Sequence, residues 1–208
     1  MLPILIFISC NNVSQKGNAA NNEQTAKVSD VDVKNLSFEE LFSKIEPTEI
    51  TDNVFKIVGQ DFTVITAGNE SYFNSMTASY GGWGQLFDVP ATWCFLRANR
   101  YTLEFIREEQ SYTMCYFDDE YKDAVMYFGS KTGRDGDKME NNPLTGVSTP
   151  DGNIAYKEAR LIIECKLMQI TTVSPDDFYL QKGREFVEGG FDEAKDYHKL
   201  VFGEITNV

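Results

Sequence analysis

The sequence has a single histidine, His198, among its 208 residues, and its four cysteines show no CxxC spacing. A metal site with several histidines is therefore excluded, and a catalytic triad with histidine would have to use His198 itself. Its sequence neighbours, a tyrosine and a lysine, favour a surface or capping role. The cysteine spacing excludes a zinc ribbon and a thioredoxin-type motif. Cys94, Cys115 and Cys165 lie in apolar runs, so we expect buried thiols rather than a disulfide framework.

Basic residues are also scarce: 19 lysines and arginines stand against 32 acidic residues, and the formal net charge is −13. A surface this acidic repels phosphate backbones, so we expect no nucleic-acid partner. A small anion can still bind where a few basic side chains gather. Apolar residues make up 42% and aromatic residues 13% of the chain, which is enough for the core of one globular domain.

The apolar run at residues 1–10, MLPILIFISC, is too short to span a bilayer. It is similar to the apolar region of a secretory signal, and Phe7-Ile8-Ser9-Cys10 resembles a bacterial lipobox. The resemblance implies cleavage before Cys10, lipidation of that cysteine, and attachment to the cell envelope. The alternative is an apolar terminus with no targeting role, on a protein that is otherwise cytoplasmic.

Residues 11–35 are rich in Asn, Ser, Gln, Lys and Ala and contain almost no large apolar residue before Val31. Such a segment cannot bury enough surface to offset the entropy that is lost on ordering. We therefore predict a flexible tether at 11–35 and one folded domain at 36–208. A frayed terminus would have the same composition.

Residues 36–208 have the patterning of a strand-rich domain. Ser37-Phe-Glu-Glu40 is a capping box that opens a short helix, which ends before Pro47. Residues 53–59 and 61–68 predict the two strands of a hairpin around a Gly-Gln-Asp turn. The remaining predictions are strands at 91–99, 111–118, 163–170 (exposed on one face) and 200–205, helices at 102–106 and 119–128, a helical turn at 175–178 and a loop at 183–190. About six or seven antiparallel strands with a few short helices predict a mainly β protein, a β-barrel with helical additions.

The most informative stretch is Tyr72–Trp83, YFNSMTASYGGW. Strand-like residues lead into Thr77–Ser79, which offers two hydroxyls and backbone N–H groups with little bulk. Gly81 and Gly82 allow a sharp turn and the close approach of a ligand. Together these features make a workable cradle for a phosphate. Taken alone, the stretch is more simply explained as a strand that runs into a glycine turn.

A second candidate anion site follows at Arg97–Thr102. Thr102 can cap a helix that continues through residues 103–106. A helix N-terminus carries partial positive charge and free N–H groups, and Arg97 and Arg100 flank this one. The combination favours phosphate binding, although an ordinary cap with solvated arginines explains it equally well.

Three pieces of sequence follow one another in a recognisable order. They are Asn74-x-Met76-Thr-Ala-Ser79, Arg97-x-x-Arg100-Tyr-Thr102, and Gly129-x-x-x-Gly133-Arg134-Asp-x-Asp137-Lys138. Each piece is weak by itself, and the third lacks the residue order of a Walker A loop. Together they cover about residues 54–208, and in this order they resemble the flavin reductase-like, FMN-binding split-barrel family.

The resemblance implies a split β-barrel and a homodimer with FMN at the subunit interface. It implies that four residues run along the flavin and its ribityl chain: Met76, Thr77, Ala78 and Ser79. It implies that four others lie near the phosphate: Arg97, Asn99, Arg100 and Thr102. Ser130 and Lys131 would contact the cofactor from their own subunit or from the partner, while Lys138 would cap the loop. A flat apolar neighbour for the flavin ring could come from Tyr80, Trp83 or Trp93.

Two functions are compatible with this resemblance. The first is an FMN-dependent oxidoreductase that passes electrons from a reduced nicotinamide, NADH or NADPH, through the flavin to an acceptor. The second is a non-catalytic flavin carrier or electron-transfer module at the cell envelope. The lipobox-like start and the absence of a recognisable nicotinamide-binding fingerprint favour the second.

Overall fold

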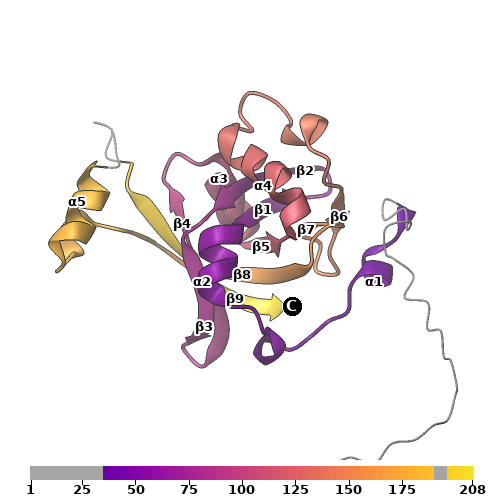
Figure 1. Cartoon of the computed structure of the whole chain (residues 1–208), viewed down its shortest axis with the longest axis horizontal. Coiled ribbons are helices and arrows are strands. Elements are labelled where there is room, and N and C mark those ends of the chain that lie inside the picture. Colours follow the sequence, from indigo (N-terminus) through magenta and orange to yellow (C-terminus); the bar gives the residue numbers. More distant parts are fainter. Residues whose placement is uncertain (1–34, 190–195) are drawn as a thin grey trace, which may run out of the picture. The chain divides into compact units, whose positions relative to one another are not determined.

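The computed structural model describes residues 35–189 and 196–208 (Figure 1). These residues belong to one compact unit, Asp32–Val208. The signal-like segment at 1–10, with Cys10, lies outside the described residues, and so does the predicted tether at 11–35 except for its last residue. Within the described ranges, no helix combines the length and the apolar character needed to cross a membrane.

Seven antiparallel strands form one sheet in the order β2-β1-β5-β8-β9-β4-β3. Their bounds are β1 Thr63–Asn69, β2 Tyr72–Ala78, β3 Gly81–Leu86, β4 Val89–Arg97, β5 Ser111–Tyr116, β8 Leu161–Thr172 and β9 His198–Asn207. A separate two-stranded ribbon consists of β6, Gly146–Ser148, and β7, Ile154–Tyr156. The prediction of a mainly β fold with six or seven antiparallel strands is confirmed.

The helices are short, and two of them cover the sheet next to the stretch at 72–83. Their bounds are α1 Phe38–Leu41, α2 Val54–Lys56, α3 Tyr101–Glu109, α4 Lys122–Ser130 and α5 Gln181–Gly189. α3 and α4 pack against β1 and β2 (Figure 1). The predicted capping box is confirmed, because Ser37 Oγ accepts a hydrogen bond from Glu40 N at 3.3 Å while the Glu40 carboxylate accepts one from Ser37 N at 2.7 Å.

The central strands are apolar on both faces. Val64 and Cys115 belong to the cluster of buried side chains that packs against α4. Their sequence neighbours Ile65 and Met114 belong to a second cluster, which lies on the opposite face because side chains alternate along a strand. We predicted that the strand around 163–170 is exposed on one face. In the structure β8 is buried on both faces over Leu161–Cys165, and only the remaining residues, 166–172, are exposed or partly exposed.

The prediction of a strand at 53–59, as the first strand of a hairpin, is wrong: residues 54–59 are helical. Asn53 Oδ1 accepts hydrogen bonds from Phe55 N at 3.0 Å and Lys56 N at 3.3 Å, so Asn53 caps the start of α2. The chain continues as a π-helical turn, η4, over Ile57–Asp61. The hairpin partner of β1 is β2 instead, and Asn69 pairs with Tyr72 across the turn.

The glycine stretch that we expected to turn sharply toward a ligand forms strand β3, paired with β4. A Cβ atom on Gly81 would lie 2.4 Å from the Trp93 carbonyl oxygen, and one on Gly82 would lie 2.9 Å from the Trp93 ring. These glycines therefore make room for Trp93 on the neighbouring strand rather than for a ligand.

The segment that we predicted as a loop at 183–190 is helical up to Gly189. Arg184 Nε donates to Glu188 Oε1 at 3.1 Å, and Gln181 Nε2 donates to Glu185 Oε1 at 2.9 Å. Side-chain pairs four residues apart stabilise an isolated helix. They support α5 in spite of its glycines, which had suggested a loop.

The three cysteines within the described residues are buried free thiols, as predicted. Burial raises the pKa of each thiol, to about 12 for Cys115 and Cys165. Desolvation likewise raises the pKa of Cys94. Because the thiolate is the reactive form, these thiols are chemically inert in the folded protein.

Candidate functional site

Three cavities lie one after another along β2, which is an edge strand of the sheet. The apolar pocket, of about 320 Å³, is lined by Phe62, Thr77, Ala78, Ser79, Met126, Gly129 and Ser130. The basic pocket, of about 40 Å³, has a lining that includes Asn74, Met76, Thr77, Asn99, Arg100, Thr102, Lys131 and Lys138. The cleft, of about 530 Å³, runs along the strand from Ser75 back to Glu70. Neighbouring cavities share walls, so the three form one continuous row.

Nine of the ten residues proposed from the sequence line the apolar pocket or the basic pocket. The end of β2 and the start of α3 are therefore brought to the same side of the domain. The tenth residue, Arg97, lines none of the three cavities. Its guanidinium Nη2 donates to Asp196 Oδ1 at 2.8 Å beside β9, where Arg97 is paired in register with His198. Burial and the positive charge of Arg97 lower the pKa of His198.

Arg100 stands at the N-cap position of α3, with its side chain exposed. No side-chain hydrogen bond caps this helix, and among the described residues the Arg100 guanidinium has no hydrogen-bond or ion-pair partner. The first N–H groups of a helix have no partner within the helix and carry partial positive charge. The N-terminus of α3 and the Arg100 side chain, which has no acidic partner among the described residues, therefore both line the basic pocket.

We expected Thr102 to cap α3 through its hydroxyl, and this is wrong. Thr102 is buried in the first turn, and its Oγ1 accepts a hydrogen bond from Asn74 Nδ2 at 2.6 Å. This bond joins β2 directly to the start of α3. Thr77 plays a similar part, because its hydroxyl donates to the carbonyl of Val125 in α4. Both side chains thus fix the walls of the pocket.

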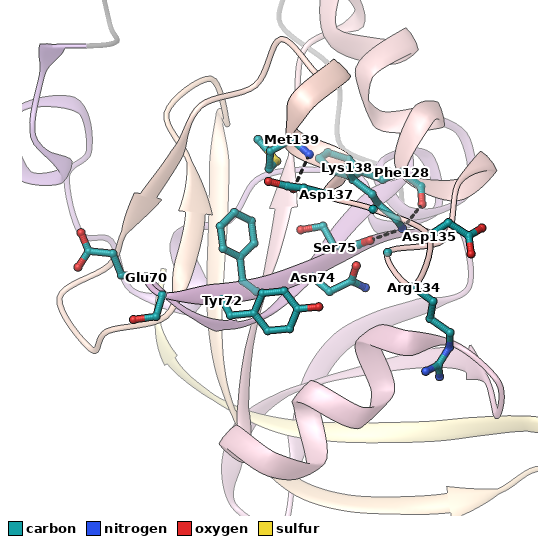
Figure 2. A pocket seen from close by; sticks show the side chains of 14 residues that line it. Glu70, Tyr72, Asn74, Ser75, Phe128, Arg134, Asp135, Asp137, Lys138 and Met139 are labelled. Atoms are coloured by element: carbon teal, nitrogen blue, oxygen red, sulfur yellow. Dashed lines mark hydrogen bonds between the residues drawn. The ribbon is translucent and has the colours of Figure 1, made fainter.

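Lys138 is the side chain whose importance the sequence did not reveal. Only 8% of it is exposed, and Nζ donates to the carbonyl oxygens of Ser75 at 2.7 Å and Phe128 at 3.0 Å, as Figure 2 shows. The loop is capped by Asp137 instead, whose Oδ1 accepts from Met139 N at 2.8 Å. Burial, and to a smaller extent Arg100, lowers the pKa of Lys138 to about 8.

A buried lysine with no carboxylate partner among the described residues is unusual, because desolvation of the charge is normally offset by an acid. Lys138 lies in the wall that separates the basic pocket from the cleft. An anion in the basic pocket would supply the missing counter-charge.

The loop at 129–138 forms the outer wall of the basic pocket and is held tightly against β2. A Cβ atom on Gly133 would lie 2.0 Å from Asn74 Oδ1, so only glycine fits at this point. Arg134 ties the same loop to α3: its Nη2 donates to Glu104 Oε1 at 2.5 Å, and its guanidinium lies 4.3 Å from the centre of the Tyr101 ring. The glycine spacing of the loop thus serves its close contact with the strand.

The apolar pocket has Phe62 and Met126 as its large apolar side chains. Phe62 has φ 68° and ψ 164°, a backbone conformation that is strained for any residue except glycine. The aromatic neighbours that we expected for a flavin ring lie elsewhere. Trp83 packs edge-on against Tyr116, with ring centres 5.7 Å apart, and neither Tyr80 nor Trp93 lines any of the three cavities.

Comparison with known families assigns the class. Residues 55–208 match the family model described as the flavin reductase like domain, and the chain belongs to this family. The match covers the sheet, α3, α4 and all three cavities. Among curated protein sequences, none matches this chain.

Solved structures of flavin reductase-like proteins share the fold. A flavoredoxin from Methanosarcina acetivorans has 19% identity and a TM-score of 0.54 over 79% of this chain and 74% of its own. An FMN-binding domain of a flavin reductases-like enzyme from Shewanella baltica has 14% identity and a TM-score of 0.55 over 79% and 74%. An FMN-binding protein from Thermus thermophilus, with bound 1-cyclohex-2-enone, has 19% identity and a TM-score of 0.54 over 70% and 67%. The predicted split-barrel fold is confirmed.

Proposed function

We propose that this protein is an FMN-dependent oxidoreductase of the flavin reductase type, which passes electrons from a reduced nicotinamide through the flavin. One observation carries the proposal: an apolar pocket and an uncompensated basic pocket lie side by side along β2. FMN has the same two parts, a flat apolar ring system and a dianionic phosphate, joined by a ribityl chain. Membership of the flavin reductase-like family and the FMN-binding proteins among its structural neighbours support the choice of cofactor.

The donor set of the basic pocket fits a phosphate. Arg100 supplies a guanidinium that can donate two parallel hydrogen bonds, and the start of α3 supplies backbone N–H groups. Lys138 supplies a buried ammonium without an acidic partner among the described residues, and Lys131 a further positive charge at the rim. Positive charge gathered at one point of a protein with a net charge of −13 favours the binding of an anion at that point.

The apolar pocket would hold the flavin ring between Phe62, Met126 and the edge of β2. The backbone of Met76–Ser79 would run along the ring and the ribityl chain, with Ser79 and Ser130 as hydroxyl partners. Bound flavin supplies the redox chemistry, so the protein needs no acid–base pair of its own. The role of these residues is to bind the flavin, to orient it and to keep water from one side of it.

We propose that a second copy of the chain covers the other side, which gives a homodimer with flavin at the interface. Met126 is 47% exposed at the rim of the apolar pocket, and the pocket has no apolar lid within the described residues. Attachment to the cell envelope through a lipidated Cys10 is also a proposal, supported by the sequence of residues 1–10 alone.

A titration of the purified protein with FMN, followed by absorption and by flavin fluorescence, tests the proposal. We expect a shifted flavin spectrum, and oxidation of NADH or NADPH once an electron acceptor is added. Arg100→Ala should weaken FMN binding, whereas the matched variant Arg107→Ala, on the exposed far end of the same helix, should not. A protein that leaves the spectrum and the fluorescence of FMN unchanged would contradict the proposal.

The second candidate function is a flavin carrier or electron-transfer module without nicotinamide turnover. The lipobox-like start favours it, because reduced nicotinamides are scarce outside the cytoplasm. The same titration separates the two functions. Tight FMN binding with a measurable redox potential, but no oxidation of NADH or NADPH with any acceptor, would favour the carrier.

A further inference from the structure

The chain before residue 55 lies outside the match to the flavin reductase like domain. Part of it, residues 35–50, is held against the domain at both ends, and we call it the strap. Near its start, Lys157 Nζ donates to the Leu36 carbonyl, and near its end Ile45 N donates to the Val208 carbonyl at 2.9 Å. The strap is therefore an ordered part of the structure that membership of the family does not explain.

A further cavity, of about 250 Å³, lies between the strap and the ends of β8 and β9, and we call it the strap cavity. Its apolar lining includes Phe38, Phe42 and Ile45 of the strap and Leu161 and Ile162 of β8. The two phenylalanine rings have their centres 4.9 Å apart and pack against the core cluster that contains Ile162. The cavity is smaller than the pockets that hold drug-sized ligands, so it suits a compact ligand with an apolar body.

The lining of the strap cavity also contains a buried carboxylate, that of Glu164, which is 2% exposed. Its Oε1 accepts hydrogen bonds from the Thr149 hydroxyl and from Asn153 Nδ2 at 2.6 Å, and its Oε2 accepts one from Asn207 Nδ2 at 3.0 Å. All three donors are neutral, and no lysine or arginine of the described ranges forms an ion pair with this carboxylate. Buried charges in proteins are normally paired. A carboxylate can accept about four hydrogen bonds, so Oε2 retains room for a further donor.

The charges around the strap cavity are negative in sum. Arg160 lines the cavity, and two carboxylates already balance it, Asp52 at 2.8 Å and Asp118 at 3.5 Å. Lys44 Nζ lies 2.6 Å from the oxygen of the amide that bonds the buried carboxylate, and the nitrogen of that amide also donates to Asp151 at 2.8 Å. In this part of the described structure, two cations thus face four carboxylates. The charge that is missing from the site is positive.

We propose that the strap cavity binds a small apolar amine in its protonated form. The ammonium group donates to Glu164 Oε2, and the apolar body lies against the rings of Phe38 and Phe42, whose faces also attract a cation. The cavity shares no lining residue with the three cavities along β2, so this inference goes beyond the proposed function and does not depend on it.

Three probes of similar shape test the proposal: 2-phenylethylamine, 2-phenylethanol and 3-phenylpropionate. They present an ammonium, a hydroxyl and a carboxylate on the same ring and a short chain. Calorimetric titration of the full chain, without flavin, gives the dissociation constants. The amine should bind at least about tenfold more tightly than the alcohol, and the carboxylate should not bind. If the amine does not bind, or the alcohol or the carboxylate binds as tightly, the proposal is overturned.

Two variants locate the site. Glu164→Gln keeps the shape of the side chain and removes its charge, so the preference for the amine over the alcohol should fall to no more than about twofold. Phe42→Ala removes one aromatic wall and should weaken both probes alike, by about tenfold. The controls are Glu108→Gln and Phe87→Ala, which alter an exposed glutamate of α3 and an exposed phenylalanine outside the cavity, and both should behave as wild type.

A preference for the amine that survives in Glu164→Gln, or an affinity that is unchanged in Phe42→Ala, would overturn the assignment to this cavity. The probe series needs no substitution, so it decides whether the protein binds an amine even if Glu164→Gln fails to fold. Phe42→Ala then decides the location, because its side chain lies on the strap rather than in the sheet.

Discussion

Replacement of Lys138 by methionine probes the basic pocket most sharply, because this lysine is buried and has no acidic partner among the described residues. Methionine keeps an unbranched apolar side chain but removes the charge. A hydrogen bond to a charged group contributes about 1.5–3 kcal/mol. We therefore expect FMN to bind about 10- to 150-fold more weakly, at 1.4 kcal/mol for each factor of ten.

Riboflavin gives this experiment its internal control, since it has the same ring and ribityl chain but no phosphate. Its affinity should change by no more than about twofold in Lys138→Met. Lys166→Met, at an exposed lysine of β8, should leave both affinities unchanged. Fluorescence quenching of each flavin measures the dissociation constants. An equal loss for FMN and riboflavin would mean that Lys138 only maintains the fold, and no loss for either would remove it from the site.

The pH dependence provides a second readout. The pKa of Lys138 is lowered from 10.5 to about 8, so above pH 8 the flavin-free protein has largely lost this charge and must regain a proton to bind phosphate. FMN affinity should fall as the pH rises through 8, and this slope should be absent in Lys138→Met. Between about pH 8 and pH 10.5, Lys138 keeps its proton in the unfolded protein but loses it in the folded protein. The free energy of unfolding of the flavin-free protein should therefore rise with pH over this range.

Three further predictions concern the pocket walls and the core. Arg100→Ala should weaken FMN binding by about 1.5–3 kcal/mol, with Arg107→Ala unchanged, and an equal affinity of the two variants would remove Arg100 from the phosphate site. Gly133→Ala should lower the free energy of unfolding, measured in urea, by about 1–3 kcal/mol, because the added Cβ atom would lie 2.0 Å from Asn74 Oδ1. Gly59→Ala is the matched control, since no atom lies within 4 Å of the added methyl group. Equal stabilities of the two variants would contradict the tight contact at Gly133. In a Cys10→Ser variant, which leaves only the three buried cysteines, a thiol reagent should modify the folded protein only at the rate of its unfolding, and rapid labelling would contradict the burial of Cys94, Cys115 and Cys165.

The sheet was predictable because its strands carry strong local signals. Alternating or continuous apolar residues bounded by polar turns located β4, β5 and β9 to within a few residues. The prediction of a strand at 53–59 failed because Val54, Ile57 and Val58 suit a strand as well as a helix. The feature that selects the helix is the cap formed by the Asn53 side chain. At Gly81 and Gly82 the glycines were recognised, but their partner, Trp93, lies on another strand and is invisible in local sequence.

The sequence predicted which residues lie together near the end of β2 and the start of α3, but not how each of them interacts. The resemblance to a family identified nine residues that line two adjoining pockets. It could not separate Arg100 from Arg97, because only the fold brings Asp196 beside the latter. It also understated Lys138, whose burial depends on the loop folding back against β2. The one sequence signal for this lysine is its place directly after Asp137, the residue that caps the next turn.

The central claim is that the basic pocket between β2 and the start of α3 holds the phosphate of a flavin. A crystal structure of the protein grown with FMN tests it most directly. We predict a phosphate within hydrogen-bonding distance of the Arg100 guanidinium and the Lys138 ammonium, with the flavin ring beside Phe62 and Met126. A phosphate bound away from both basic side chains, or a pocket in which FMN at saturating concentration leaves no density, would contradict the account.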